Sequence, residues 1–196
     1  MNYRNLDDYE LVKQFQGGNN SSFEVLMERY KNKVYTYILI TVKKPDLAED
    51  IFQDTFLKVI KSLQAKKYTD NGRFLSWVIR IAHNLIIDYY RKASNAKTYA
   101  HEEKDFDYYC NKNDDSKNIE DELITSQIEN DVRKLLNKLP DEQKEVVVLR
   151  HYIGLSFKEI SEETNVSINT ALGRMRYALI NMRKMVKENN ITLMYY

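Results

Sequence analysis

Apolar residues recur at every third or fourth position through the N-terminal half of the chain, which is the spacing that places them on one face of an α-helix. One such run follows a capping box, Ser21-x-x-Glu24, and consists of Phe23, Leu26, Met27, Tyr30, Val34 and Ile38. Two more runs predict helices over residues 46–63 and 74–91, separated by the turn-forming pair Asn71-Gly72. The pattern predicts three or four helices in this half.

The C-terminal half repeats the helical spacing in shorter segments. A stripe that ends before Pro140 is formed by Ile128, Val132, Leu135, Leu136 and Leu139. The next helix is predicted over residues 141–151. The capping box Ser156-x-x-Glu159 then predicts a short helix, and Ser167 is expected to cap a long last one.

Residues 93–126 lie between the two patterned halves and lack helical spacing. Residues 92–126 hold 5 basic and 9 acidic residues, a net charge of −4. A segment of this kind buries too little apolar surface to fold on its own. We therefore expect an all-α protein of two small helical domains, residues 1–92 and 127–188. A flexible acidic linker over 93–126 joins them, and a tail, 189–196, follows.

The composition excludes several classes of protein. With 5 Gly and 2 Pro among 196 residues, the chain has too few turn formers for an all-β fold, and its single Cys fits a reducing cytoplasm. No apolar run approaches the ~20 residues of a membrane span, so no membrane insertion is expected. The three His residues lie on separate segments and no phosphate-binding loop occurs, so we expect no cofactor, no metal site and no enzyme. Because the net charge is +1, any binding to nucleic acid must come from local patches.

The predicted helix over 74–91 has a packing side and a basic–aromatic stripe. The packing side consists of Phe74, Val78, Ile81, Ala82, Leu85 and Tyr89. The other side gathers Trp77, Arg80, Asn84, Ile87, Asp88 and Arg91. Of these, Trp77, Arg80, Asn84 and Arg91 form the stripe, and the preceding loop adds Lys66, Lys67, Tyr68 and Arg73. Arginine pairs with phosphate and tryptophan stacks on an unpaired base, so these residues are candidates for binding single-stranded nucleic acid. The alternative is a solvated face with one half-buried tryptophan.

The predicted helix over 46–63 also has two sides. Its packing side consists of Phe52, Phe56, Val59, Ile60 and Leu63. Its outer side carries Asp50, Gln53, Asp54 and Leu57, which we call the docking face. A leucine among polar groups on an exposed face suits the docking of another protein, whereas the alternative is a solvated face with one stray leucine.

The segment after Ser156 has the form of a helix-turn-helix. On its long second helix an inward side is predicted from Ile168, Ala171, Leu172, Met175, Ala178, Leu179, Met182 and Val186. The candidates for contact with duplex DNA are Ser167, Asn169, Thr170, Arg174, Arg176 and Lys184. Small polar groups at the start of such a helix approach base edges in the major groove, and basic groups further along hold phosphates. The alternative is a plain helical hairpin in a bundle.

Both halves, in this order, resemble an extracytoplasmic-function type sigma factor of bacterial RNA polymerase. The resemblance covers about residues 6–92 and 125–188. It is carried by SSFEVLMERY, DLAEDIFQDTFLKVIKSL, GRFLSWVIRIAHNLIIDYYRK and LLNKLPDEQKEVVVLRHYIGLSFKEISEETNVSINTALGRMRYAL. Members of that family commonly carry a basic residue and a serine where this chain has Leu172 and Gly173.

The resemblance implies a role for each candidate surface. The docking face would bind the clamp coiled coil of core RNA polymerase, whose flap is a further expected contact. The basic–aromatic stripe and the loop over 66–73 would hold the unpaired strand of the −10 promoter element, and the helix-turn-helix residues would lie at the −35 element. An anti-sigma factor is also an expected partner.

Two other hypotheses remain open at this stage. The chain is compatible with a stand-alone helix-turn-helix regulator in which residues 1–91 dimerise or sense a signal. It is also compatible with an interaction protein that occupies polymerase without starting transcription. The first of these predicts tight binding to a palindromic site without polymerase, and the second predicts polymerase binding without transcripts.

Overall fold

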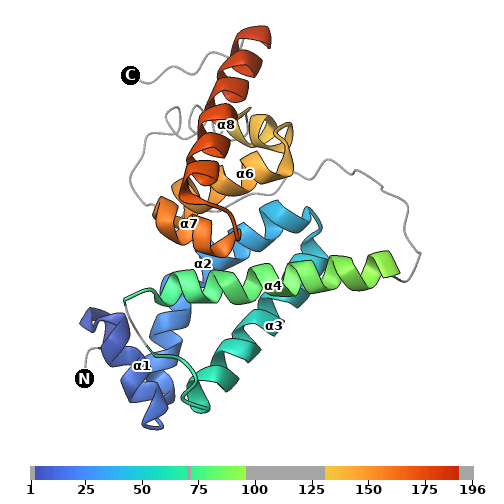
Figure 1. Cartoon of the computed structure of the whole chain (residues 1–196). Helices are drawn as coiled ribbons and strands as arrows, with labels where there is room; N and C mark the ends of the chain where they lie inside the picture. The colour runs from blue at the N-terminus through green and yellow to red at the C-terminus, as the bar shows by residue number, and fades with distance from the viewer. Residues whose placement is uncertain (1–2, 70–71, 96–130, 190–196) are drawn as a thin grey trace, which may run out of the picture. The chain divides into compact units, whose positions relative to one another are not determined.

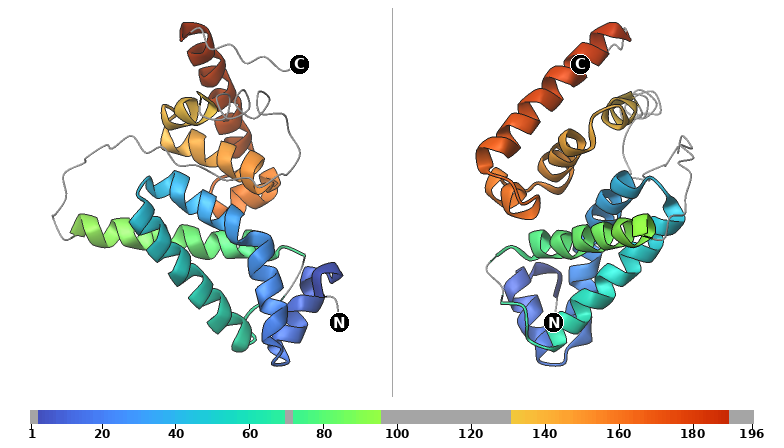
Figure 2. Two further views of the ribbon diagram at one scale, coloured as in Figure 1. Left: turned by 180° about the vertical axis from the view of Figure 1, so that it is seen from behind. Right: turned by 45° about the vertical axis from the view of Figure 1, so that its right-hand side comes forward.

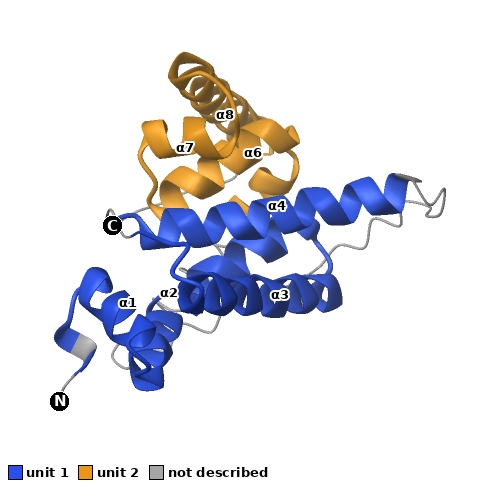
Figure 3. Cartoon of the chain, turned by 60° about the horizontal axis from the view of Figure 1, so that its bottom comes forward, with its two compact units in different colours: residues 1–106 blue, residues 107–196 orange. Residues whose placement is uncertain are grey.

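The computed structural model describes residues 3–69, 72–95 and 131–189. The chain forms two compact units, Met1–Phe106 and Asp107–Tyr196, which Figure 3 shows in different colours. Every regular element in the described stretches is helical, which confirms the predicted all-α class. The predicted linker and tail lie almost entirely outside the described residues.

The N-terminal unit is a helical bundle. Its elements are the 3₁₀ turn η1 (Tyr3–Asn5) and the helices α1 (Asp8–Gln16), α2 (Asn20–Val42), α3 (Pro45–Gln64) and α4 (Phe74–Asn95). Figure 1 shows α4 lying across α2 and α3, and it packs against both. The sequence pattern allowed for α1 without locating it, because this short helix buries only Leu11, Val12 and Phe15 between polar residues.

The start of α2 differs from the prediction. The predicted capping box at Ser21 and Glu24 is wrong, because the side chain of Asn19 caps this helix and accepts a hydrogen bond from the Ser21 backbone N–H at 3.1 Å. The Ser22 hydroxyl donates to the Asn19 carbonyl at 2.6 Å. Asn19 follows Gly18, whose φ of 99° separates α1 from α2, so the N-cap of α2 lies two residues before Ser21.

The helix α4 begins at Phe74 as predicted and runs past Arg91 to Asn95. Its buried apolar residues are Phe74, Val78, Ile79, Ala82 and Ile86. Tyr89, which was predicted on the packing side, is 41% exposed. The reason is that the C-terminal turns of α4 extend past α2 and α3, as the left view of Figure 2 shows.

The C-terminal unit contains the predicted helix-turn-helix. Residues 131–137 are helical, and α6 (Asp141–Val147), the π-helical segment η2 (Val148–Ile153), α7 (Phe157–Glu163) and α8 (Ile168–Glu188) follow. The capping box at Ser156 is confirmed: its backbone N–H donates to Glu159 Oε2 at 2.9 Å, and its hydroxyl accepts from the Glu159 N–H at 3.3 Å. The turn between α7 and α8 passes through Asn165 in the left-handed conformation, with φ of 52°.

The inward side of α8 is narrower than predicted. Ala171, Met175 and Ala178 are buried, whereas three residues of the predicted inward side are exposed, namely Ile168, Leu172 and Leu179. The helices that face α8 are short, since α6 and α7 have 7 residues each against 21 in α8. They cover one stripe of the long helix and leave the flanking apolar residues in solvent.

The two serines of the predicted capping boxes give a first testable prediction. We expect Ser156→Ala to lower the stability of the α7–α8 region by about 0.5–2 kcal/mol, because one backbone donor of α7 loses its acceptor. The measurement is amide hydrogen exchange of α7 and α8, which resolves one unit from the other. The control is Ser21→Ala, inside α2, for which we expect a change within about 0.5 kcal/mol. Equal losses in the two variants would contradict this assignment of the caps.

Candidate nucleic-acid and polymerase interface

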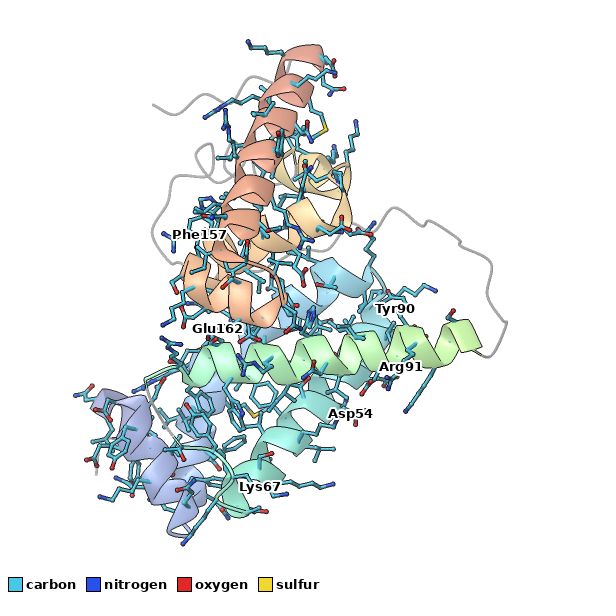
Figure 4. All side chains as sticks on the ribbon, in the orientation of Figure 1. Asp54, Lys67, Tyr90, Arg91, Phe157 and Glu162 are labelled. Atoms are coloured by element: carbon cyan, nitrogen blue, oxygen red, sulfur yellow. The ribbon has the colours of Figure 1, made fainter. Side chains whose placement is uncertain are left out.

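The basic–aromatic stripe lies along α4 on the side away from the bundle core. Arg80, Asn84 and Arg91 are exposed and Trp77 is half-buried. Arg91 Nη2 lies 2.8 Å from Asp88 Oδ1, with the arginine side chain 70% exposed. A surface ion pair of this kind contributes little, so Arg91 remains available to an incoming phosphate. Figure 4 shows Tyr90 and Arg91 on the C-terminal half of α4.

The loop between α3 and α4 carries further basic side chains. Lys66 and Lys67 are exposed and Arg73 is half-buried, while residues 70–71 lie outside the described part of the chain. Tyr68, which was predicted to bind the strand together with the basic residues of this loop, is 8% exposed. Its ring stacks on the indole of Trp77, with centroids 4.2 Å apart and planes at 28°. The loop aromatic therefore packs on the stripe and is not presented to solvent.

The docking face is exposed along the outer side of α3. Asp50, Gln53 and Asp54 are exposed, and Leu57 between them and the C-terminal end of α3 is 52% exposed. That opposite side is held by Ile51, Thr55, Phe56, Val59 and Leu63, all buried. Packing therefore fixes the direction of the docking face. Figure 4 labels Asp54 on it, with Lys67 beyond the C-terminal end of α3.

The start of α8 carries exposed polar side chains, and the backbone at Gly173 beside them is accessible. The Ser167 hydroxyl accepts from the Thr170 N–H at 3.0 Å and lies 2.8 Å from the Thr170 hydroxyl, so both hydroxyls take part in the helix cap. Asn169 is exposed, and a Cβ built on Gly173 meets no atom within 4 Å. Another molecule can therefore approach the first two turns of α8 closely.

The basic candidates on α8 have different surroundings. Arg174 is half-buried, Arg176 is exposed, and Lys184 Nζ lies 3.8 Å from Glu188 Oε1 at the surface. Tyr177, which was not among the predicted site residues, is 61% exposed on the same outer side. These groups extend the polar surface from the helix start along its length.

An apolar depression on α7 and α8 was missed in the sequence. It is an open hollow of about 470 Å³ lined by Phe157, Leu172, Met175, Arg176, Leu179, Ile180 and Arg183. Leu172, Leu179 and Ile180 are 43%, 37% and 44% exposed. The signal that could have indicated it is the spacing of Leu172 and Leu179, two helical turns apart and each four residues before an arginine. The sequence analysis instead placed both leucines in the core.

The described residues contain no group of three or more His, Cys, Asp or Glu side chains that could hold a metal ion. In the same part of the chain, no helix has the length and apolar character needed to cross a membrane.

The chain has two helical units, and the second contains the helix-turn-helix of α7 and α8, which places it among the helix-turn-helix proteins. Residues 26–96 match the model of sigma-70 region 2, and residues 129–176 match that of sigma-70 region 4. Together the two matches span more than half of the chain. The chain belongs to the sigma-70 family, and its curated relatives include sigma factors of the extracytoplasmic-function (ECF) type.

Curated relatives match over nearly the whole chain. The ECF RNA polymerase sigma-E factor of Haemophilus influenzae is 28% identical over 95% of this chain and 96% of its own length. The ECF RNA polymerase sigma factor SigW of Bacillus subtilis is 28% identical over 90% of this chain and 95% of its own.

Solved structures support the fold. CnrH, in complex with the cytosolic domain of CnrY, superposes with a TM-score of 0.63 at 22% identity, over 92% of this chain and 97% of that one. The sigma factor RpoE of Bartonella quintana, in complex with the anti-sigma factor NepR, gives 0.64 at 18% identity, over 84% of this chain and 96% of that one.

Proposed function

We propose that this sigma factor binds core RNA polymerase through the docking face of α3 and holds the unpaired strand of the −10 element on α4. The observation that carries this proposal is the placement of the two surfaces on neighbouring, mutually packed helices of one unit. A protein that docks by α3 thereby presents α4 at a fixed position relative to polymerase. The protein acts by binding and not by catalysis, in the cytoplasm where promoter DNA lies.

The chemistry of the α4 surface suits a melted strand. Unpaired bases expose their faces, on which an indole stacks, and the phosphates between them attract arginine and lysine. Arg80, Asn84 and Arg91 follow Trp77 along one outer side of α4, and Lys66 and Lys67 lie on the connection between α3 and α4. This stripe combines a stacking group with cations along a single line, as a strand requires.

The start of α8 is the surface that we assign to the −35 element. Asn169 and the open backbone at Gly173 face solvent, and Arg176 lies two helical turns from Asn169. A duplex groove accepts a helix end of this kind, with amide groups near the bases and cations near the phosphates. Because Ser167 and Thr170 already cap α8, we expect them to position the helix more than to select bases.

The apolar depression is the surface that we assign to the flap of polymerase. Exposed leucine and isoleucine side chains between Arg176 and Arg183 suit a partner that inserts apolar side chains and carries acidic groups beside them. This assignment gives the C-terminal unit a polymerase contact that adjoins its DNA contact and shares Arg176 with it.

A substitution in the depression tests the flap assignment. Leu179→Asp is expected to weaken core polymerase binding by about tenfold, because a charge replaces a half-exposed anchor. The measurement is fluorescence anisotropy of the labelled chain against core polymerase. Tyr177→Asp is the control, since Tyr177 is 61% exposed outside the depression. An unchanged affinity for Leu179→Asp would refute the flap assignment.

An anti-sigma factor remains a proposed partner. RpoE of Bartonella quintana was solved with one. We expect such a protein to cover the docking face or the apolar depression, so that it competes with core polymerase. Competition in the anisotropy assay tests this, and simultaneous binding of both partners would contradict it.

The function as a whole predicts that polymerase governs DNA binding. The net charge of +1 supplies little general attraction for DNA, so the free chain should bind any fragment weakly. Core polymerase holds both units near the promoter and raises their effective concentration. We therefore expect the chain to form a stable complex with core polymerase, and to bind promoter DNA tightly only when core polymerase is present. Tight binding of a palindromic fragment by the free chain would instead support a stand-alone regulator.

A further inference from the structure

The indole of Trp77 is already stacked on one side. The Tyr68 ring lies at 4.2 Å and 28° from it, close to a parallel stack, while Phe74 lies at 5.8 Å and 52°. Tyr68 also meets the edge of Phe74, at 5.9 Å and 80°. Tyr68 therefore occupies one face of the indole, and a base that stacks on Trp77 must use the opposite face.

Hydrogen bonds connect helix α1 to the residues of this stack and to their neighbours. Gln16, the last residue of α1, donates from Nε2 to the Tyr68 carbonyl at 3.4 Å. At the other end of α1, Asp8 accepts hydrogen bonds from Arg29 and from the Tyr30 hydroxyl. The Tyr30 ring in turn lies 5.7 Å from that of Phe74. The contacts thus connect both ends of α1 to the aromatic cluster at the start of α4, which consists of Tyr30, Tyr68, Phe74 and Trp77.

The burial of the stack shows that it is built into the fold. Tyr68 is 8% exposed and Phe74 is 1% exposed, although Tyr68 belongs to the connection between α3 and α4. Lys66, two residues earlier, adopts the left-handed conformation with φ of 53°, which turns the chain after α3. A ring held in this way cannot leave the indole without exposing apolar surface that the unit now buries.

We propose that Tyr68 is a positioning residue for strand binding: it backs the indole of Trp77 so that an unpaired base completes a three-layer stack of Tyr68, Trp77 and base. This inference rests on the proposed role of Trp77 in holding the −10 strand. The physical gain is pre-organisation, because an indole fixed on one face loses little freedom when a base covers the other. Tyr68 itself does not touch the DNA.

The test compares three substitutions of Tyr68 in the full chain bound to core polymerase. The probe is a pool of fluorescein-labelled single strands of random sequence. Tyr68→Phe keeps the flat ring, and we expect strand affinity within about twofold of the unsubstituted chain. Tyr68→Leu keeps apolar bulk without a flat face, and Tyr68→Ala removes both; we expect each to weaken strand binding by about threefold to tenfold. Affinity for core polymerase should not change in any variant.

A spectroscopic measurement separates positioning from loss of folding. Trp77 is the single tryptophan of the chain, so its emission and its quenching by acrylamide report this stack in the free protein. We expect quenching to increase for Tyr68→Leu and Tyr68→Ala and to stay unchanged for Tyr68→Phe, with the same helical circular dichroism in all. Loss of helical signal in Tyr68→Ala leaves Tyr68→Leu as the deciding variant.

The outcomes distinguish this inference from the proposed function. If Trp77→Ala weakens strand binding and Tyr68→Leu leaves it unchanged or tighter, Tyr68 does not position the indole, or it competes with the base for the same face, and the inference is overturned. If Trp77→Ala itself leaves strand binding unchanged, the assignment of the strand to Trp77 fails, and this inference fails with it.

Discussion

Replacing Leu57 by aspartate is expected to weaken binding to core RNA polymerase by about thirtyfold or more. Leu57 is 52% exposed between the acidic and amide groups of the docking face, and its helix is held by a fully packed opposite side. A single exposed anchor of this kind contributes ~2 kcal/mol or more to an interface, which corresponds to that factor. Because the side chain already faces solvent, the substitution should leave the fold intact.

A matched control exists on α4. Ile87 is 47% exposed, so Ile87→Asp makes nearly the same chemical change at a similar exposure outside the docking face. Anisotropy of the labelled chains against core polymerase should show the loss for Leu57→Asp and nearly unchanged affinity for Ile87→Asp. Equal affinities in the two variants would show that α3 does not carry the polymerase contact.

Replacing Trp77 by alanine should impair promoter opening and leave polymerase binding intact, whereas Leu57→Asp acts on polymerase binding. Stacking on an aromatic contributes ~1–3 kcal/mol per base, so promoter opening should fall by about fivefold to more than a hundredfold while polymerase binding stays the same. Trp77→Phe, which keeps a smaller ring, should give an intermediate loss. Permanganate reactivity of unpaired thymines on a promoter that the holoenzyme opens measures the effect.

The control for Trp77 is an aromatic residue away from the stripe. Tyr9 on α1 is 54% exposed, and Tyr9→Ala should leave promoter opening unchanged. If Trp77→Ala opens the promoter as well as the unsubstituted chain does, the indole is a packing residue of the aromatic cluster and not a strand contact.

A capping-box pattern in the sequence predicts a helix start correctly in one of two cases in this structure. Ser156 and Glu159 formed the expected box because nothing before Ser156 competes for the same backbone donors. Ser21 and Glu24 show the same pattern, but Asn19 precedes them, and an asparagine side chain is an equally good acceptor. The sequence pattern alone does not decide between two acceptors two residues apart.

The exposed faces of α8 and the burial of Tyr68 could not be predicted for a different reason. Both depend on tertiary packing. Helical spacing assigned Leu172 and Leu179 to the core, but the core side of α8 is as wide as the short helices that cover it. Tyr68 follows two lysines in a polar loop, and nothing local indicates that its ring folds back onto Trp77. The exposure of Asp50, Gln53, Asp54 and Leu57 was predictable, because a buried and an exposed stripe on α3 follow from the spacing of a single helix.

The most direct test of the central claim is transcription by core polymerase that lacks any other sigma factor. The purified chain is added with fragments of genomic DNA, and the 5′ ends of the transcripts are sequenced. We predict defined start sites that share two upstream elements at a fixed spacing, and loss of these transcripts with Leu57→Asp. Stable polymerase binding without any transcript would contradict the account and identify the chain as a protein that occupies polymerase without starting transcription.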